Sequence, residues 1–340
     1  MKTAELRLAR GLRERIALPD WLFRYGAALT IAAVVAFFSV ANEHFFTYGN
    51  LTDILRSISI VTFLALGVTF SLVVDGFDVS VGSTTSLATI AAASMLVLHR
   101  QELLIAILVP LLCGALVGLL NALLAVKLRL PDLLATLAVM YIVNGVQLTY
   151  SKGYSIYEGM PSAIGAQTGK FIPSFKFIGQ GEWLGVPIPV ILMFAFVGIA
   201  YLFLEFTTFG RKMYMVGGNP VAAKLFGIPV GAYRTFAYVA SGLFAAIGGI
   251  VLASRIGTGQ VSAGAPLLMD AVAAAYIGYA LFGDKRPSVV GTLLGCILIG
   301  VLLNGLTMMN VPYFAQDIVK GGILVLALAF SFLRKDPREH

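Results

Sequence analysis

At least six runs of apolar residues, each about 20 residues long, follow one another along the chain with short polar segments between them. A helix of about 20 residues crosses the roughly 30 Å hydrocarbon core of a bilayer. The apolar and polar alternation of a membrane β-barrel is absent from these runs. The sequence therefore predicts an all-α membrane protein, a polytopic helical bundle.

Composition supports this class, because 59% of the 340 residues are hydrophobic and 12% are charged. One soluble core could not bury so much apolar surface. We predict about ten transmembrane helices, with broken or re-entrant segments between some of them. The ten spans are Leu22 to Ala41, Leu51 to Val74, Val79 to Leu98, Leu103 to Val126, Pro131 to Tyr150, Pro187 to Glu205, Tyr233 to Ala253, Leu267 to Phe282, Val289 to Met308 and Phe314 to Leu333.

The positions of the basic residues predict the orientation. With ten spans and a cytoplasmic amino terminus, the inner segments hold seventeen of the twenty-four Lys and Arg residues, which is the bias expected of cytoplasmic loops. We therefore expect a cytoplasmic segment at residues 1–21, one transmembrane domain at 22–333 and a cytoplasmic tail at 334–340, in a bacterial inner membrane. Residues 1–20 lack the features of a cleaved signal peptide. The charge of +7 lies in loops that set topology, so we expect no nucleic-acid partner.

Two polar interruptions are long. Residues 151–186 are rich in Gly and Pro, and the span count places them on the periplasmic side. They are expected to receive a partner there, or to form a surface loop without a dedicated role. Residues 206–232 are expected in the cytoplasm and include Arg211 and the pair Gly217 and Gly218. Here Asn219 and Pro220 predict a capped short helix from Val221 to Phe226, which Gly227 would end.

The segment from Asp75 to Ser83 places two carboxylates, Asp75 and Asp78, and two hydroxyls, Ser80 and Ser83, between apolar runs. Polar groups at membrane depth are costly, and irregular backbone there is tolerated when it is buried in protein or lines a wet cavity. The segment predicts a break or re-entrant turn beside a substrate path, with Asp78 or Ser80 capping the next helix. The alternative is an interfacial turn that never meets substrate.

A second irregular region runs from Ser254 to Asp270 and includes Gln260 and Ser262. It is expected to form the matching half of the cavity, or else an ordinary external turn. Three asparagines inside spans, Asn121, Asn144 and Asn304, are further candidates for the path. Their simplest interpretation is hydrogen bonding between helices, and the more specific alternative is contact with a sugar hydroxyl.

The sequence gives little support for an enzymatic function. The three histidines lie at span edges or at the terminus, so neither a metal cluster nor a histidine-based triad is easy to assemble, and we assign no metal site and no catalytic residue. No P-loop is present, since Gly169 and Lys170 lack both the upstream Gly and the following Ser or Thr. Any energy from ATP would therefore come from another chain.

Three groups of residues resemble a known family. They are Asp75-Gly-Phe-Asp78-Val-Ser80-Val-Gly82-Ser83, then Gly217-Gly218-Asn219 with Ala222-Ala223 and Gly227-Ile228, then Val290-Gly291-Thr292-Leu-Leu-Gly295 with Asn304-Gly305-Leu306. In this order they resemble the permease subunits of bacterial ABC importers for ribose and related monosaccharides. The broader family also includes branched-chain amino-acid permeases.

The resemblance implies a translocation path between two permease subunits, two cytoplasmic ATPase domains that use ATP and Mg, and a periplasmic substrate-binding protein. It assigns ATPase docking to the loop with Arg211, Gly217, Gly218, Asn219, Ala222, Ala223 and Gly227, and implies no cofactor on this chain. The expected substrate is a monosaccharide or related polyol, with autoinducer-2 or branched-chain amino acids as alternatives. After Ile277 this chain departs from the family's usual Gly-Gly-Thr-Ser-like turn. An ion-coupled carrier using Asp75, Asp78 or Asp270 is the remaining alternative.

Overall fold

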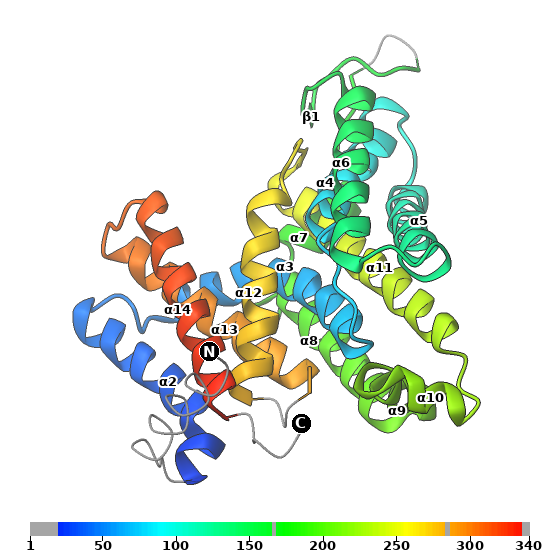
Figure 1. Cartoon of the computed structure of the whole chain (residues 1–340). Coiled ribbons are helices and arrows are strands. Elements are labelled where there is room, and N and C mark those ends of the chain that lie inside the picture. The colour runs from blue at the N-terminus through cyan, green and yellow to red at the C-terminus, as the bar shows by residue number, and fades with distance from the viewer. Residues whose placement is uncertain (1–19, 165–167, 283–285, 335–340) are drawn as a thin grey trace.

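The chain folds into a bundle of long helices with a few very short strands (Figure 1). The computed structural model describes residues 20–164, 168–282 and 286–334, so most of the predicted segment 1–21 and of the tail 334–340 lies outside it. The long helices are α2 (Asp20–Ala41), α3 (Tyr48–Val73), α4 (Val81–Ala93), α5 (Leu103–Ala122), α6 (Asp132–Ser151), α8 (Ile188–Tyr201), α11 (Val230–Ile256), α12 (Ala265–Phe282), α13 (Val289–Met308) and α14 (Tyr313–Arg334). Single π-helical turns extend three of them: η1 (Ser94–Leu98), η2 (Leu123–Lys127) and η3 (Leu202–Phe206).

Each predicted span coincides with one of these helices to within a few residues, and α13 has the predicted bounds. Within the described residues, seven helices are long and apolar enough to cross a membrane. They begin at Tyr48, Val81, Leu103, Asp132, Ile188, Val230 and Val289. The apolar stretches Leu29–Ala41 and Ala265–Ala280 are shorter. The prediction of an all-α, multi-pass membrane protein is therefore confirmed.

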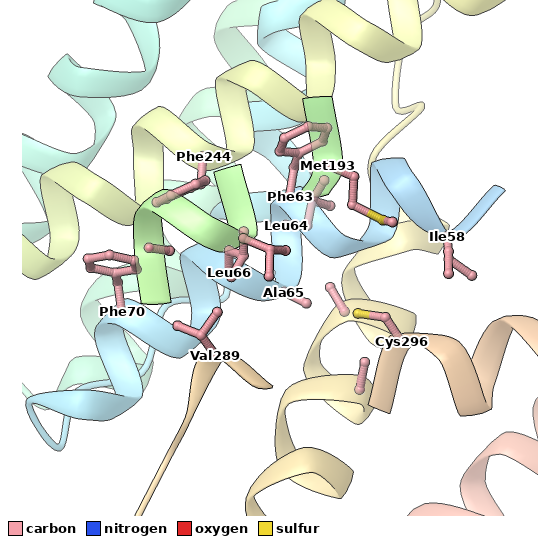
Figure 2. Close-up of a cluster of buried hydrophobic side chains, with 14 of the residues drawn as sticks. Ile58, Phe63, Leu64, Ala65, Leu66, Phe70, Met193, Phe244, Val289 and Cys296 are labelled. Carbon is pink, nitrogen blue, oxygen red and sulfur yellow. The ribbon is translucent and has the colours of Figure 1, made fainter. Parts of the chain in front are cut away.

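Helices α3 and α11 form the centre of the bundle. The middle of α3, around Phe63 and Leu64, is completely buried, and its side chains pack against α8, α11 and α13 (Figure 2). Small residues permit the closest approaches, since a Cβ on Gly114 of α5 would overlap the backbone of α11 at Gly242. Gly295 of α13 lies equally close to Ala274 of α12. Small residues thus let neighbouring helix backbones pack closely within one chain.

The polypeptide between α6 and α8 carries its own small elements. Strand β1 (Ile156–Tyr157) pairs with β4 (Thr258–Gly259), which follows α11, and β2 (Glu182–Trp183) pairs with β3 (Val186–Pro187) in a hairpin. Leu184 and Gly185 both have positive φ, as a type I′ hairpin turn requires. The short helix α7 (Pro173–Gln180) packs on α11 through Gly179, whose N–H donates to Ser254 Oγ. We call this end of the bundle the long-loop end.

The opposite end carries two further helices, α9 (Thr208–Gly218) and α10 (Pro220–Leu225), which lie together in Figure 1. The predicted helix after Asn219 is confirmed: Asn219 Oδ1 accepts a hydrogen bond of 2.9 Å from Ala222 N. Gly227 has φ 75°, and Ile228 N donates to Ala223 O across the end of the helix. Helix α9 was not predicted. We call this end the α10 end.

Candidate translocation site and coupling loop

The chain is irregular between α3 and α4, over residues 74–80, as the sequence predicts. Asp78 is completely buried in this break. Its carboxylate accepts hydrogen bonds from Ser80 in the break, from Asn121 of α5 and from Ser241 of α11. Its Oδ1 accepts from Ser80 N (2.8 Å), Ser80 Oγ (2.6 Å) and Asn121 Nδ2 (3.2 Å), and its Oδ2 accepts from Ser241 Oγ (2.7 Å). One carboxylate therefore ties the break to α5 and α11.

This polar cluster corrects one detail of the prediction. Ser80 precedes the first turn of α4, but its side chain makes no capping bond: its Oγ donates to Asp78 Oδ1 and accepts from Asn121 Nδ2 (2.8 Å). Asp78 itself accepts the N–H of Ser80, one residue before the helix. Ser83 Oγ donates to the Ser80 carbonyl and stays buried. Among the described residues, neither Asn121 Oδ1 nor Tyr238 Oη, both buried beside the break, has a hydrogen-bond partner.

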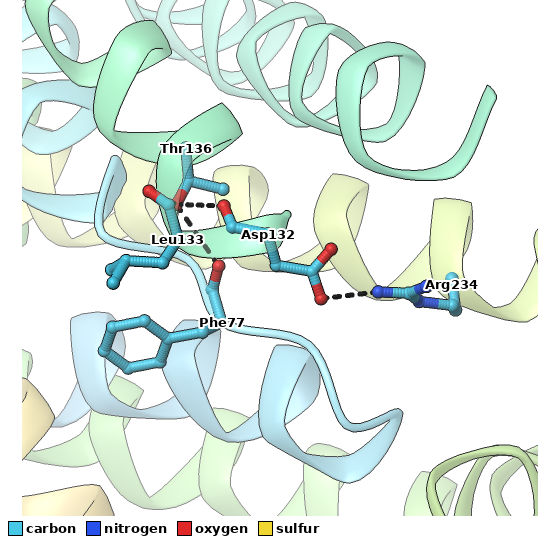
Figure 3. A network of polar contacts seen from close by, with 5 residues as sticks. All are labelled: Phe77, Asp132, Leu133, Thr136 and Arg234. Carbon is cyan, nitrogen blue, oxygen red and sulfur yellow. Dashed lines mark hydrogen bonds and ion pairs between the residues drawn. The ribbon is translucent and has the colours of Figure 1, made fainter. Parts of the chain in front are cut away.

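Asp75 lies apart from this cluster, at the α10 end. It is exposed, has φ 55°, and lines a cavity of about 880 Å³ together with Arg129 and Lys224. Beside it, Asp132 of α6 forms an ion pair with Arg234 of α11 (Figure 3). Thr136 Oγ1, also on α6, donates to the Phe77 carbonyl in the break (3.2 Å). The break is thereby tied to α6 as well.

Two other predicted residues, Asp270 and Asn304, line one cavity at the long-loop end. This cavity has a volume of about 400 Å³, and α3, α11, α12 and α13 form its walls. Asn304 exchanges two hydrogen bonds of 2.9 and 3.0 Å with the side-chain amide of Asn50. Asp78 does not line this cavity. The structure therefore separates Asp270 and Asn304 from the cluster around Asp78.

Asp270 is buried in α12 and pairs with a cation. The Nζ atom of Lys320, on α14, lies 2.9 Å from Asp270 Oδ1 and 2.8 Å from Asp317 Oδ1. Asp317 and Lys320 are three residues apart on one helix, a spacing that favours a local pair, whereas no sequence spacing indicates the contact of Lys320 with Asp270. Lys320 offsets the cost of burying the Asp270 carboxylate.

The remaining candidates lie elsewhere. Asn144 of α6 accepts a hydrogen bond from Gln147 Nε2 (2.8 Å), one turn along the same helix. Gln260 is exposed, and its carbonyl accepts from Thr89 Oγ1. Ser262 is exposed with φ 57° in the turn before α12. The region from Ser254 to Asp270 is less irregular than predicted, because α11 extends to Ile256 and α12 begins at Ala265.

The residues expected to dock the ATPase lie on α9, on α10, between the two helices (Asn219) and just after α10 (Gly227). Arg211 is exposed and donates to the Phe206 carbonyl. Ala222 is half-buried and Ala223 is buried against the bundle. On the outer side of α10, Val221, Leu225 and Phe226 expose 69%, 83% and 78% of their surface. An apolar ridge of this kind on a short helix is typical of a surface that a partner covers.

Gly217 and Gly218 differ sharply in their surroundings. A Cβ on Gly217 would overlap the carbonyl oxygen of Val73, the last residue of α3, whereas a Cβ on Gly218 would have no atom within 4 Å. Only glycine at position 217 allows α9 to lie this close to α3. The carboxyl end of α3, where the break begins, therefore rests directly on the helix that leads into α10.

A second contact holds α9 in place. Tyr214 Oη donates to Glu205 Oε1 (3.0 Å), Arg286 forms an ion pair with Glu205 (3.0 Å), and its guanidinium lies 4.6 Å from the Tyr214 ring centroid. Burial, and then the charge of Glu205, raise the pKa of the Tyr214 phenol. The phenol therefore stays protonated and can donate at any physiological pH.

Several residues of these groups were missed by reasoning from the sequence. Ser241 and Tyr238 come to the break from α11, and Asp53 and Ser57 come to the cavity from α3. The four-residue spacing of Asp53 and Ser57 places both on one helix face, which is a usable signal. No local pattern pairs Ser241 with Asp78, because they are 163 residues apart. Across the described ranges, no group of three or more His, Cys, Asp or Glu side chains could hold a metal ion.

The fold is a multi-helix membrane bundle with an apolar ridge on a short end helix and a polar cavity at the other end. The family model for the branched-chain amino acid transport system / permease component matches residues 50–328. The chain belongs to this family.

Curated relatives cover nearly the whole chain. A ribose import permease protein of Haemophilus influenzae is 32% identical, covering 92% of this chain and 94% of its own length. Its counterpart in Bacillus subtilis is 34% identical, with 96% and 98% covered. A xylose transport system permease protein of H. influenzae is 31% identical, with 89% and 94% covered. No solved structure gives a significant match.

Proposed function

We propose that this chain is the membrane-spanning permease subunit of an ATP-driven importer for a monosaccharide or related polyol. The observation that carries the proposal is the similarity, at 31 to 34% identity over at least 89% of the chain, to permeases named for ribose and xylose. The family's name also covers branched-chain amino acids, but galactose import permeases are among the relatives too, which favours a sugar.

In this proposal all ten long helices cross the inner membrane, and both termini lie in the cytoplasm. The bias of basic residues supports this orientation. The α10 end is then cytoplasmic, and the long-loop end, with residues 151–186, is periplasmic. A substrate-binding protein would deliver its sugar there, and a second permease subunit would complete the path.

The ATPase subunit would dock on the α10 end. Leu225 and Phe226 offer it apolar anchors, and Arg211 offers a charge at the edge. The ATPase, not this chain, would bind ATP and Mg. Its closure would push α10 and α9, and Gly217 would pass the movement to the end of α3. Because α3 also lines the cavity at the long-loop end, one rigid helix joins the two ends.

Ion-coupled transport is the alternative. It would need an acid that can exchange protons or sodium, but Asp270 is paired with Lys320 and Asp78 is saturated by four donors. Neither arrangement favours reversible ion binding.

The test is uptake by proteoliposomes that contain this chain with its proposed ATPase subunit, together with the purified binding protein. Uptake of D-ribose, D-galactose, D-xylose and L-leucine is measured with ATP, without ATP, and with a proton or sodium gradient alone. We expect one sugar to accumulate with ATP only. Accumulation of leucine alone would assign the amino-acid branch, and uptake driven by an ion gradient would contradict the proposal.

A further inference from the structure

The cavity at the long-loop end has the size of a small-molecule site. Its volume of about 400 Å³ lies in the range of roughly 300 to 1,000 Å³ that ligand pockets occupy. The side chains of Asp53, Ser57 and Arg255 line it, together with those of Asp270, Asn304 and Thr307. All of these walls belong to one chain, so the cavity needs no second subunit to be formed.

Two of the polar side chains have unused hydrogen-bonding capacity. Asp53 and Ser57 are exposed, and within the described ranges neither side chain makes a hydrogen bond or an ion pair closer than 4 Å. Arg255 donates from Nη1 to the Arg56 carbonyl (3.2 Å) and keeps further N–H donors, since a guanidinium has five. A carboxylate, a hydroxyl and a guanidinium together can accept from and donate to neighbouring hydroxyl groups of one ligand.

The charges around the cavity balance. Asp53 and Arg255 carry opposite charges, and Lys320 compensates Asp270 from behind α12. A site with no excess charge favours a ligand without net charge. The rest of the wall is aliphatic, with Ile58, Leu252 and Leu303, and suits the C–H face of a sugar ring.

From these features we infer that the cavity is a monosaccharide-binding site inside a single permease subunit, with Asp53, Ser57 and Arg255 contacting the sugar hydroxyls. The inference rests on the proposed function and adds a place where the sugar binds after its release at the long-loop end. It separates this site from Asp78, to which we assign a structural role.

A Ser57→Cys variant tests the inference directly. Among the described residues Ser57 makes no hydrogen bond that the change would break. The parent protein carries two native cysteines, the half-buried Cys113 and the buried Cys296 of the cavity wall, and therefore serves as the control for the reagent. A membrane-impermeant methanethiosulfonate is added to proteoliposomes with the complete transporter. We expect modification to block uptake in Ser57→Cys and to leave uptake unchanged in Thr52→Cys, which is on the same helix but does not line the cavity.

Protection by sugar measures binding without transport. The sugar that the parent transporter takes up should slow the modification of Ser57→Cys, and L-leucine should not. Adding Asp53→Asn should raise the half-protecting sugar concentration about tenfold, since a hydrogen bond to a charged group is lost. Adding Glu43→Gln, an exposed acid in the turn between α2 and α3, should leave that concentration unchanged.

Different results contradict the proposed function and the inferred sugar-binding site. A parent transporter that takes up none of the three sugars contradicts the proposed function, and the inference falls with it. A parent that transports sugar, combined with unprotected labelling of Ser57→Cys or with uptake that survives labelling, overturns the inference alone. If Ser57→Cys does not insert, Thr307→Cys on the opposite wall of the cavity replaces it, with the same two expected results.

Discussion

Gly217 of α9 lies against the backbone carbonyl of Val73, the last residue of α3, so closely that a side chain at position 217 would overlap it. Its neighbour Gly218 faces open space. The two adjacent glycines therefore form a matched pair for testing how α9 is seated.

We expect Gly217→Ala to lower the thermal stability of the purified subunit, because overpacking of a close contact costs about 1 to 3 kcal/mol. Gly218→Ala should be neutral to within about 0.5 kcal/mol, as for most surface changes. Thermal unfolding in detergent measures both. Equal stability of the two variants would show that α9 can move off α3 without cost.

The buried carboxylate of Asp78 should hold the break in its shape. Asp78→Asn replaces an acceptor of four hydrogen bonds by a side chain that accepts fewer, which leaves buried donors unpaired at about 1 to 3 kcal/mol each. We expect lower melting temperature and lower yield in the membrane fraction. Asp75→Asn is the control, because Asp75 is exposed and Asn tolerates its positive φ. If the two variants melt alike, Asp78 does not pin the break.

The ion pair of Asp270 and Lys320 predicts how thermal stability changes when one or both partners are replaced. Lys320→Met leaves a buried carboxylate without a cation and should destabilise by about 3 to 5 kcal/mol. Adding Asp270→Asn should recover much of this loss. Asp317→Asn should have little effect, since that side chain is 70% exposed. A double variant that is less stable than Lys320→Met would contradict the pairing. The measurement is unfolding of each purified variant by heat.

Sequence reasoning located the helices well, because a long apolar run is a local signal. Helix α13 has the predicted bounds, and the cap at Asn219 follows from two adjacent residues. Helix α9 was missed, because its eleven residues are amphipathic and were read as a polar loop.

The site was harder to predict. Asp78 comes from the break between α3 and α4, Asn121 from α5 and Ser241 from α11, and hydropathy says nothing about which faces of those helices meet it. The sequence indicates Asn304 as a polar residue inside a span and Asp270 as the end of the second irregular region, but only packing shows that both share a cavity with Asp53. Asp75 and Asp78 are three residues apart in sequence, and a left-handed turn at Asp75 sends them into different surroundings.

The apolar ridge on α10 should bind the ATPase. Replacing Leu225 by Asp removes an anchor that is 83% exposed, so the fold should be preserved while affinity for the ATPase falls at least about tenfold. Leu184→Asn is the control, since Leu184 is 87% exposed in the hairpin at the long-loop end, where Asn tolerates the positive φ. Co-purification of tagged ATPase from membranes measures both. If the ATPase co-purifies undiminished with Leu225→Asp, α10 is not part of the interface with the ATPase.

The most direct test of the whole account compares sugar accumulation with ATP hydrolysis in proteoliposomes that carry the complete transporter, with Gly217→Ala or Gly218→Ala, below the melting temperature of both. If α9 passes the movement of the ATPase to α3, Gly218→Ala accumulates sugar as the parent does. Gly217→Ala then hydrolyses ATP but accumulates no more sugar than the ATP-free control. Equal accumulation by the two variants would contradict the account.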